Sequence, residues 1–277
     1  MKWLDGAFSN HVKTALKAAV EAGKVIMEVY GGQLETELKA DDSPVTLADR
    51  RAHDIISKTL QTTGIPVISE EMNLPDHEIR KKWQRYWLVD PLDGTKEFID
   101  KGVDFTVNIA LMEEHQPVLG ILLLPCSKEI YLGDKLQQKG WKTTLDRLEW
   151  ADLHETSWQS LPKLTPVEDC TIVASRSHLK GETLEFIEQI KEHSEGQEVR
   201  LLYRGSAVKF CMIAEGKAQV YPRFAPCMEW DTAAGQALCE ALGAIMVRME
   251  DRRPLDYSKP LLLNPPFLLT APGKQHF

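Results

Sequence analysis

Two aspartates stand three residues apart at the end of an apolar run, in the segment Trp87-Leu88-Val89-Asp90-Pro91-Leu92-Asp93-Gly94-Thr95. Two carboxylates at this spacing can share or bridge hard divalent cations, which prefer oxygen ligands. Gly94 permits close approach of the backbone, Thr95 can begin a helix, and the free N–H groups of both can hold a phosphate oxygen. A turn capped by aspartate explains many isolated Asp-x-x-Asp-Gly sequences. The apolar strand directly upstream, with Pro91 and Thr95 in place, favours metal-assisted phosphate chemistry instead.

Three further acidic residues stand where they can join this pair. Glu70 follows a strand-like run that ends at Ile68, and it can supply a third carboxylate to the same cluster. Asp231 stands at the start of a predicted helix, where an aspartate often serves only as an N-cap. Asp49 follows Thr46 by three residues, which resembles a capping box and also fixes an ionised acid in the first turn of a helix. These residue types alone leave the structural and the chemical roles of Asp231 and Asp49 open.

Hydrophobic periodicity predicts the elements that must hold these side chains. In the first half of the chain, apolar residues at helical spacing predict helices over residues 12–30 and 46–60. Short apolar runs separated by turn residues predict strands over residues 65–69, 86–90, 105–112, 117–124 and 129–132. The strand predicted over residues 86–90 therefore ends at Asp90. Glu70 directly follows the strand predicted over residues 65–69.

The second half of the chain alternates strands and helices. Residues 133–164 are polar and weakly periodic, which predicts a connection with room for edge strands. After it, the pattern predicts strands over residues 171–174, 200–203, 218–222 and 244–247, and helices over 179–193, 207–214 and 230–242. This layout predicts an α/β protein with an α+β half over residues 1–164 and an α/β half over residues 165–277.

Composition excludes several classes of partner. The 277 residues include 43% hydrophobic and 27% charged ones, as in an ordinary globular protein, and the formal net charge of −8 disfavours binding to nucleic acid or anionic lipid. Five cysteines without a C-x-x-C pair favour buried thiols in a reducing compartment. Residues 1–12 lack an apolar leader, and the apolar runs are too short to span a bilayer. The sequence therefore predicts a cytoplasmic protein, and leaves peripheral membrane contact and the choice of monomer or homodimer open.

Taken together, these segments resemble the inositol monophosphatase superfamily. The resemblance rests on Ser69-Glu70-Glu71, on the run from Trp87 to Ile99, and on Trp230-Asp231-Thr232-Ala233-Ala234-Gly235. Further motifs are similar to those of the bacterial CysQ-type 3′(2′),5′-bisphosphate nucleotidases, namely residues 108–111, 175–178, 209–211 and 221–224. The resemblance extends from about residue 12 to the C-terminus. It implies the layered αβαβα fold of the sugar phosphatases and inositol monophosphatases.

The resemblance also implies roles for individual residues. Two or three Mg²⁺ ions would be held by Glu70, Asp90, Asp93, Asp231 and the backbone carbonyl of Leu92. Asp49 and Thr95 would position and deprotonate the attacking water. The implied substrate contacts are Glu70, Leu92, Asp93, Gly94, Thr95, His178, Gly205, Ser206, Lys209 and Asp231. Lys209 is the implied counter-charge for a second phosphate, and Arg176 and Arg223 are weaker candidates for this role.

The activity that the resemblance implies is hydrolysis of 3′-phosphoadenosine 5′-phosphate to AMP and phosphate by direct attack of water, in sulfur metabolism, with inhibition by lithium. The chain departs from the subfamily pattern in the longer stretch 136–164 and in Ala207 and Val208, where Ser and Leu are commoner. These departures leave the predicted metal site intact and bear on substrate contacts.

Three alternatives stay open at this stage. The first is an inositol or sugar monophosphatase of the same superfamily. The second is a phosphatase of the haloacid dehalogenase type, which forms an aspartyl phosphate on an Asp-x-Asp motif; the Asp-x-x-Asp spacing with Pro91 and Leu92 between the acids argues against it. The third is a non-catalytic protein that binds nucleotide through metal ions, and the full set of expected ligands disfavours it.

Overall fold

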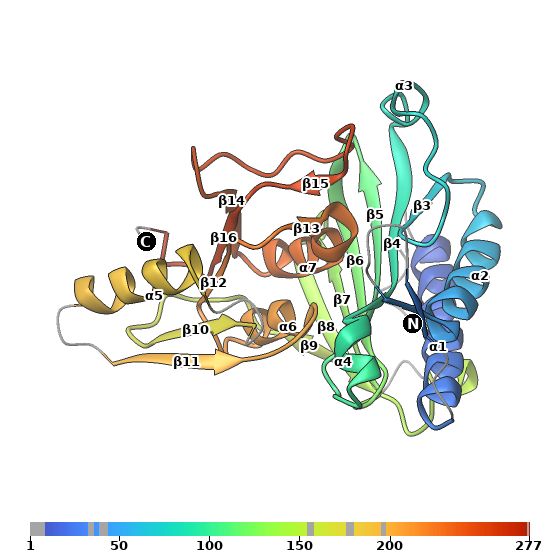
Figure 1. The fold of residues 1–277 in the computed structure, drawn as a ribbon, viewed down its shortest axis with the longest axis horizontal. Coiled ribbons are helices and arrows are strands. Elements are labelled where there is room, and N and C mark those ends of the chain that lie inside the picture. The colour runs from blue at the N-terminus through green and yellow to red at the C-terminus, as the bar shows by residue number, and fades with distance from the viewer. Residues whose placement is uncertain are drawn as a thin grey trace.

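The protein folds into alternating layers of helix and sheet, as the computed structural model shows (Figure 1). The structure describes residues 9–32, 36–38, 44–153, 158–175, 180–194, 198–275 and 277. The layers are, in order, α1 (Ser9–Tyr30) with α2 (Leu47–Gln61), a seven-stranded sheet, α6 (Val208–Ala214) with α7 (Glu229–Ala241), a five-stranded sheet, and α5 (Glu182–His193). This αβαβα arrangement confirms the fold class that the sequence predicts.

The strands of the seven-stranded sheet lie side by side in the order in which they occur along the chain. Its strands are β3 (Val67–Ser69), β4 (Arg85–Asp93), β5 (Thr106–Glu113), β6 (Gln116–Leu124), β7 (Glu129–Asp134), β8 (Lys139–Thr144) and β9 (Gln159–Leu161), in that spatial order. The pair β3 and β4 is parallel, and every later pair is antiparallel. Ser69, the last residue of β3, pairs with Val89 of β4, so Glu70 lies beside Asp90.

Alternation of side chains along β4 divides the core into two parts. Trp87 and Val89 belong to the apolar cluster that includes α1 and α2. Tyr86 and Leu88 belong to the cluster that includes α6 and α7. Because side chains of a strand point to opposite faces in turn, Asp90 falls on the face of α6 and α7. The alternation therefore directs this carboxylate toward the helix that carries Asp231.

The five-stranded sheet lies on the other side of α6 and α7. Its strands are, in spatial order, β11 (Val199–Tyr203), β10 (Cys170–Ala174), β12 (Val220–Arg223), β16 (Phe267–Thr270) and β14 (Ile245–Arg248). The neighbours of β10 are parallel to it, whereas β16 is antiparallel to β12 and β14. Its outer face packs on α5 through Ile187 and Ile190. Two short antiparallel pairs complete the strands: β1 (Thr36–Leu38) with β2 (Pro44–Thr46), and β13 (Cys227–Met228) with β15 (Leu263–Asn264).

Residues 133–164 contain the strands for which the sequence pattern left room, although the pattern gave no bounds for them. β7 continues to Asp134, and β8 and β9 extend the seven-stranded sheet. Trp141 of β8 is buried in the cluster that includes α1. β8 has a single large apolar residue, Trp141, beside two lysines and two threonines, so its sequence shows no clear strand pattern. The segment also contains a short 3₁₀ helix at Trp150–Asp152.

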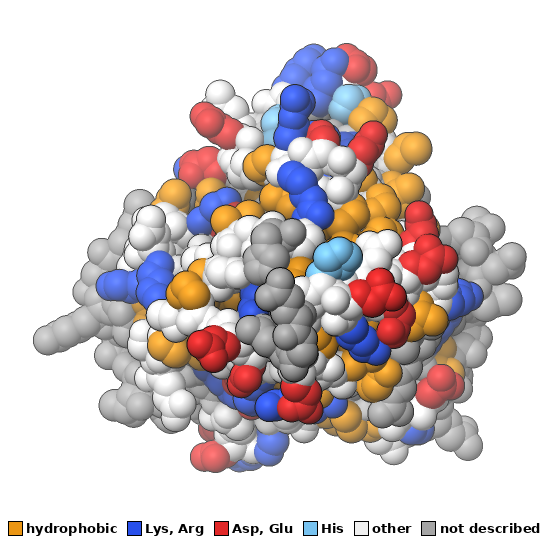
Figure 2. Space-filling model, turned by 90° about the vertical axis from the view of Figure 1, so that its left-hand side faces the viewer, with side chains coloured by type: hydrophobic (Ala, Val, Ile, Leu, Met, Phe, Trp, Pro, Cys, Tyr) orange, Lys and Arg blue, Asp and Glu red, His pale blue; other side chains and the backbone are white. Residues whose placement is uncertain are grey.

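Two short helices stand near the ends of β4. α3 (His77–Arg80) precedes the strand, and α4 (Thr95–Ile99) follows it directly. The start of α4 at Thr95 confirms that this residue begins a helix. No helix in the described part of the chain is long and apolar enough to cross a membrane. In Figure 2, coloured side chains of both charges are interspersed with apolar ones, so no single sign of charge dominates this face.

Candidate active site

A bulge in β4 places Asp90 and Asp93 on the same face of the sheet. Asp90 pairs with Asn108 and Asp93 pairs with Thr106, so three steps along β4 match two steps along β5. One extra residue in a strand resets the alternation of side chains, whereas regular spacing of three would point the two acids to opposite faces. Pro91 lies within the bulge and has no N–H to donate to the ladder. The strand therefore does not end at Asp90, as the sequence predicted, but continues through the bulge to Asp93.

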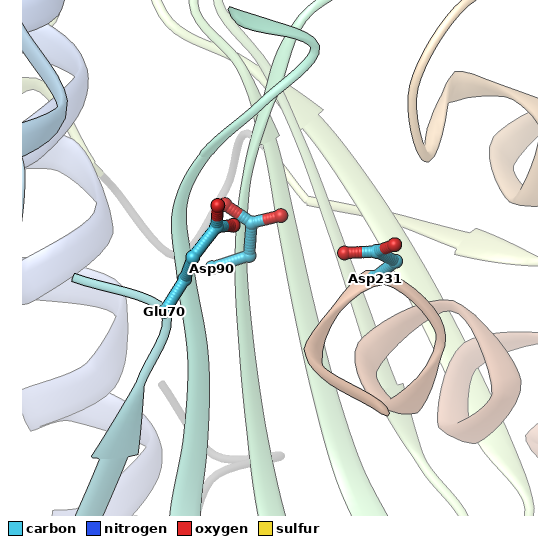
Figure 3. A group of neighbouring side chains, drawn as sticks. All are labelled: Glu70, Asp90 and Asp231. Atoms are coloured by element: carbon cyan, nitrogen blue, oxygen red, sulfur yellow. The ribbon is translucent and has the colours of Figure 1, made fainter. Parts of the chain in front are cut away.

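Three of the predicted ligands converge at this position. Glu70, Asp90 and Asp231 each offer a carboxylate oxygen, and these oxygens lie within 4.8 Å of one another. Figure 3 shows Glu70 and Asp90 side by side, with Asp231 directed toward them from the first turn of α7. The Glu70 N–H donates to the carbonyl of Val89 at 3.2 Å, which holds the turn after β3 against β4. Residues far apart in sequence thus form one acidic cluster.

The charges of this cluster require a partner. Burial, followed by the charges of Glu70, Asp93 and Asp231, raises the pKa of Asp90 well above its usual range. Burial and the charges of Asp93 and Glu70 raise the pKa of Asp231 to about 8. A divalent cation among the three carboxylates would remove both the repulsion and the burial penalty. Because all three donors are hard oxygens, the set fits Mg²⁺ better than a softer metal.

Asp231 is not the N-cap residue that the sequence left open as its structural role, because Met228 is the N-cap of α7 and Asp231 is the third residue of the helix. The helix begins at Glu229, one residue before the predicted start, and Asp231 lies in its first turn. One carboxylate oxygen accepts a hydrogen bond from the Met228 N–H at 2.9 Å. An acid in the first turn is also favoured by the helix dipole. This bond fixes the carboxylate while it faces Glu70 and Asp90.

A second acid, Asp49, lies beside the cluster and touches Thr95. The predicted capping box at the start of α2 is confirmed, since Asp49 Oδ2 accepts from the Thr46 N–H at 2.7 Å. The Thr95 hydroxyl is 3.1 Å from Asp49 Oδ1 and 3.3 Å from the Leu92 carbonyl oxygen. Burial raises the pKa of Asp49, although hydrogen bonds from Thr46 and Thr95 favour its ionised form. The contact gives Thr95 a carboxylate that can receive its proton.

Gly94 is required by the crowding between β4 and α4. Its φ is +93°, in the left-handed region that favours glycine. A Cβ at this position would lie 3.0 Å from the Asp104 carbonyl oxygen and 3.2 Å from the Ser206 Cβ. The absence of a side chain lets the chain turn directly from the acids into α4.

A pocket beside the acidic cluster contains both negative and positive groups. Asp93 and Asp231 line it together with Lys209, Arg223 and the ring of Tyr221. Lys209 is almost fully buried, and burial lowers its pKa to about 8, against the opposite effect of Asp93. Its Nζ donates to the Ser206 carbonyl at 2.5 Å and lies 5.3 Å from the centre of the Tyr221 ring. A bound anion would favour the charged form of Lys209.

Of the remaining residues predicted to contact the substrate, some lie at the pocket and others lie outside the described part of the chain. Ser206 lines the pocket and donates to Asp93 Oδ2 at 2.7 Å, while the Gly205 N–H donates to Asp104 Oδ2 at 2.9 Å. His178 and Arg176 lie outside the described residues. Arg223 directs its guanidinium to the carbonyls of Ala225 and Pro226.

The sequence analysis assigned no individual role to Asp104, Thr106 or Asn108, although Asn108 begins the motif at residues 108–111. Thr106 and Asn108 are the direct partners of Asp93 and Asp90 on β5. Both are buried polar residues, with 0% and 1% of their surfaces exposed. Polar residues in an otherwise apolar strand, aligned opposite the two acids, were the signal that could have identified them.

Protonation of the cluster gives a prediction for Mg²⁺ binding. The pKa of Asp231 rises from about 3.9 in an unfolded chain to about 8 in the metal-free fold. The folded state binds more protons, so this group reduces the stability of the metal-free protein as pH rises through that window. Mg²⁺ needs the ionised form. We therefore expect Mg²⁺ to raise the unfolding temperature more at a pH of about 9 than at about 6.

Thermal unfolding with and without saturating Mg²⁺ measures this difference, with Asp231→Asn as the control. The variant should lose much of the pH dependence because its side chain does not titrate. An equal Mg²⁺-induced shift at both pH values in the unchanged protein would show that protons and Mg²⁺ do not compete at this cluster.

Comparison with known proteins gives the same fold and a consistent family. The sequence profile of the inositol monophosphatase family matches residues 9–274. The 3′(2′),5′-bisphosphate nucleotidase CysQ of Salmonella typhimurium is 44% identical over 257 residues, which cover 91% of this chain and 96% of the relative. The crystal structure of CysQ from Bacteroides thetaiotaomicron has 39% identity and a TM-score of 0.84, covering 96% of this chain and 98% of the other. Inositol monophosphatase II of Staphylococcus aureus shares the fold, with 20% identity and a TM-score of 0.73 over 96% and 92% of the two chains.

Proposed function

The chain belongs to the inositol monophosphatase family, and we propose that it is a Mg²⁺-dependent 3′(2′),5′-bisphosphate nucleotidase that releases phosphate from 3′-phosphoadenosine 5′-phosphate. The observation that carries this proposal is the convergence of Glu70, Asp90 and Asp231 beside a pocket that also contains Lys209. The relatives named as this nucleotidase, matched over nine tenths of the chain, support the choice of substrate.

In this proposal Glu70, Asp90, Asp93, Asp231 and the carbonyl of Leu92 hold two or three Mg²⁺ ions. The bound ions lower the pKa of water and neutralise charge on the phosphate. The Leu92 N–H donates to Asp90 Oδ1 at 3.0 Å, which orients this carboxylate within the bulge. Without metal, the four acids would repel the phosphate group of the substrate. The residues that bind the ions would therefore keep the substrate out until the ions are bound.

Asp49 and Thr95 supply general-base catalysis. Thr95 can take the proton of the attacking water if it passes its own proton to Asp49, whose Oδ1 lies 3.1 Å away. The capping bonds of Asp49 leave this oxygen directed at Thr95, because they are made by Oδ2. Gly94 and Thr95 at the start of α4 would hold an oxygen of the phosphate that is cleaved.

The reaction proceeds without a phosphoenzyme in this proposal. Cys227 lines the pocket, but burial raises its pKa to about 12, so it stays a thiol and a poor nucleophile. In this proposal Asp90 and Asp93, which the bulge puts on the same face of the sheet, would act as metal ligands and not as nucleophiles. Rapid acid quench should therefore trap no protein-bound phosphate; a phosphorylated aspartate would restore the haloacid dehalogenase alternative.

The second phosphate of the substrate would be neutralised by Lys209, with Gly205, Ser206 and His178 as further contacts. Burial of Lys209 supports this role, because a cation with a pKa lowered by desolvation gains most from an incoming anion. An inositol monophosphate has no second phosphate and cannot use this interaction.

Substrate preference tests the proposal. We expect kcat/KM for 3′-phosphoadenosine 5′-phosphate to exceed that for inositol 1-phosphate at saturating Mg²⁺, by about tenfold or more for one charge-assisted contact. The opposite preference would keep the metal chemistry and establish a sugar or inositol monophosphatase. Binding of the nucleotide without release of phosphate would establish a non-catalytic binding protein.

Other expectations are part of the same proposal. We propose two functional halves, residues 1–164 and 165–277; this is supported by the division of the two sheets between them, although α7 packs on the seven-stranded sheet. We also propose a cytoplasmic location, supported by five free cysteines of which four are buried. A role in sulfur metabolism is proposed from the relatives named as this nucleotidase. Inhibition by lithium and the choice between monomer and homodimer stay predictions.

A further inference from the structure

The turn before α6 joins the two halves of the protein at Asp93. The Gly205 N–H donates to Asp104 Oδ2 at 2.9 Å, and the Ser206 hydroxyl donates to Asp93 Oδ2 at 2.7 Å. Ser206 has φ +48°, a left-handed conformation that is strained for a residue other than glycine. The turn that holds the Ser206 backbone in this conformation also places its hydroxyl within reach of Asp93.

The Ser206 hydroxyl is itself held by a buried threonine. Thr106 Oγ1 lies 2.7 Å from Ser206 Oγ and 2.8 Å from Asn108 Oδ1. Asn108 Nδ2 lies 3.4 Å from Asp93 Oδ2, a long contact compared with that from Ser206. Thr106 is fully buried, and Asn108 is 1% exposed. The three polar side chains therefore form a network around one oxygen of Asp93, in which Thr106 and Asn108 are buried and Ser206 is half-buried at the pocket.

Counting protons assigns a direction to this network. A hydroxyl has one proton to donate, and an ionised carboxylate only accepts. Ser206 gives its proton to Asp93, so the proton in the contact between the two hydroxyls belongs to Thr106. With the Asn108 amide as placed, Thr106 would also donate to Asn108 Oδ1 and so would use its one proton twice. If the amide is turned, Nδ2 faces Thr106 and donates to it. The turn gives up the 3.4 Å contact of Nδ2 with Asp93 Oδ2 and sets Oδ1 opposite that oxygen. A half-turn of an amide exchanges its nitrogen and oxygen without moving other atoms, and the two are assigned from their partners.

We propose that Thr106 is a positioning residue for the metal site, acting through a one-way series of hydrogen bonds from Asn108 to Thr106 to Ser206 to Asp93. This inference rests on the proposed function, because it takes Asp93 as a ligand of Mg²⁺. Thr106 touches neither substrate nor metal in this account. It supplies the proton that keeps the single donor of Ser206 directed at Asp93, and so fixes the orientation of that carboxylate.

The series predicts a specific pattern among four variants. Thr106→Val keeps the shape of the side chain and removes its hydroxyl, so Ser206 is free to turn away from Asp93. We expect the affinity for Mg²⁺ to fall about tenfold, the lower end of the effect of residues that orient metal ligands. Thr106→Ser restores the hydroxyl and should return the affinity to near the unchanged value. Ser206→Ala should weaken Mg²⁺ binding at least as much as Thr106→Val.

The double variant distinguishes positioning from general support of the fold. If Thr106 acts only through Ser206, adding Thr106→Val to Ser206→Ala changes the Mg²⁺ affinity no further. A threonine that merely fills space would weaken binding by the same factor in both backgrounds. Thr143→Val is the matched control, because Thr143 is a buried threonine on β8 of the same sheet. It should leave Mg²⁺ affinity unchanged, whatever its effect on the unfolding temperature.

Calorimetric titration of the metal-free proteins with Mg²⁺ measures these affinities without reference to catalysis. The proposal is overturned if Thr106→Val binds Mg²⁺ as the unchanged protein does, if Thr106→Ser fails to restore binding, or if the two substitutions act independently. Phosphate release from 3′-phosphoadenosine 5′-phosphate is measured in parallel. Absence of release with the unchanged protein, together with the expected Mg²⁺ pattern, would contradict the proposed function and leave the role of Thr106 standing.

Discussion

Thr95→Val is expected to lower kcat by about 10²–10⁴-fold, the range typical of general-base catalysis, while Mg²⁺ binding stays close to that of the unchanged protein. The hydroxyl of Thr95 lies between Asp49 Oδ1 and the Leu92 carbonyl. Valine preserves the shape but cannot pass a proton to Asp49. The acids of the metal cluster are unchanged, so the loss should appear in kcat and not in the dependence of the rate on Mg²⁺.

Thr95→Ser is the matched control, since it restores the hydroxyl at the start of α4. It should recover most of the activity, with a small deficit from the freer rotation of serine. Steady-state kinetics at saturating Mg²⁺ compare the three proteins. If Thr95→Val retained most of its kcat, the base would lie elsewhere and the contact between Thr95 and Asp49 would serve only to cap the helices.

Asp93→Asn should lower kcat by at least about a hundredfold, because it removes a charge from a proposed metal ligand. Substitution of a residue that only orients a metal ligand already lowers activity by up to about a hundredfold. The amide is similar in shape, so the bulge and the contact with Ser206 should persist. Raising the Mg²⁺ concentration should recover only part of the activity, since the remaining acids bind the ions in an altered position.

Activity of the Asp93→Asn variant is measured over a series of Mg²⁺ concentrations. Asp134→Asn provides a comparison, because Asp134 is a buried aspartate at the end of β7 whose carboxylate bonds to Gln137. This second variant should keep normal Mg²⁺ dependence. Near-normal kcat in Asp93→Asn would mean that the metal site is wrongly placed.

The sequence predicted the elements of the fold well where a helix is buried on one face or a strand on both faces. The helices α1 and α2 and the strands β4 to β7 follow their apolar patterns within a few residues. β8 and β9 were predicted only as possible edge strands without bounds, because their sequences are short and mostly polar. The predicted end of β4 at Asp90 was wrong for a different reason, since the strand continues to Asp93. A bulge at Pro91 depends on pairing with β5, and periodicity along a single strand does not reveal it.

The candidate site was predictable in its acids and less so in its contacts. Asp90 and Asp93 are close in sequence, and a strand pattern with a glycine after it indicates their chemistry. The contact of Asp49 with Thr95 joins residues 46 positions apart, so local pattern alone could not predict it and the family resemblance supplied it. Thr106 was assigned no role, because only the register of β4 with β5 sets it against Asp93.

Phosphate release from 3′-phosphoadenosine 5′-phosphate, by protein freed of metal and then supplied with Mg²⁺, tests the central claim most directly. The convergence of Glu70, Asp90 and Asp231 predicts negligible release without metal and rapid release once Mg²⁺ is added. Undiminished release in the absence of any divalent cation would contradict a metal-dependent reaction at this cluster.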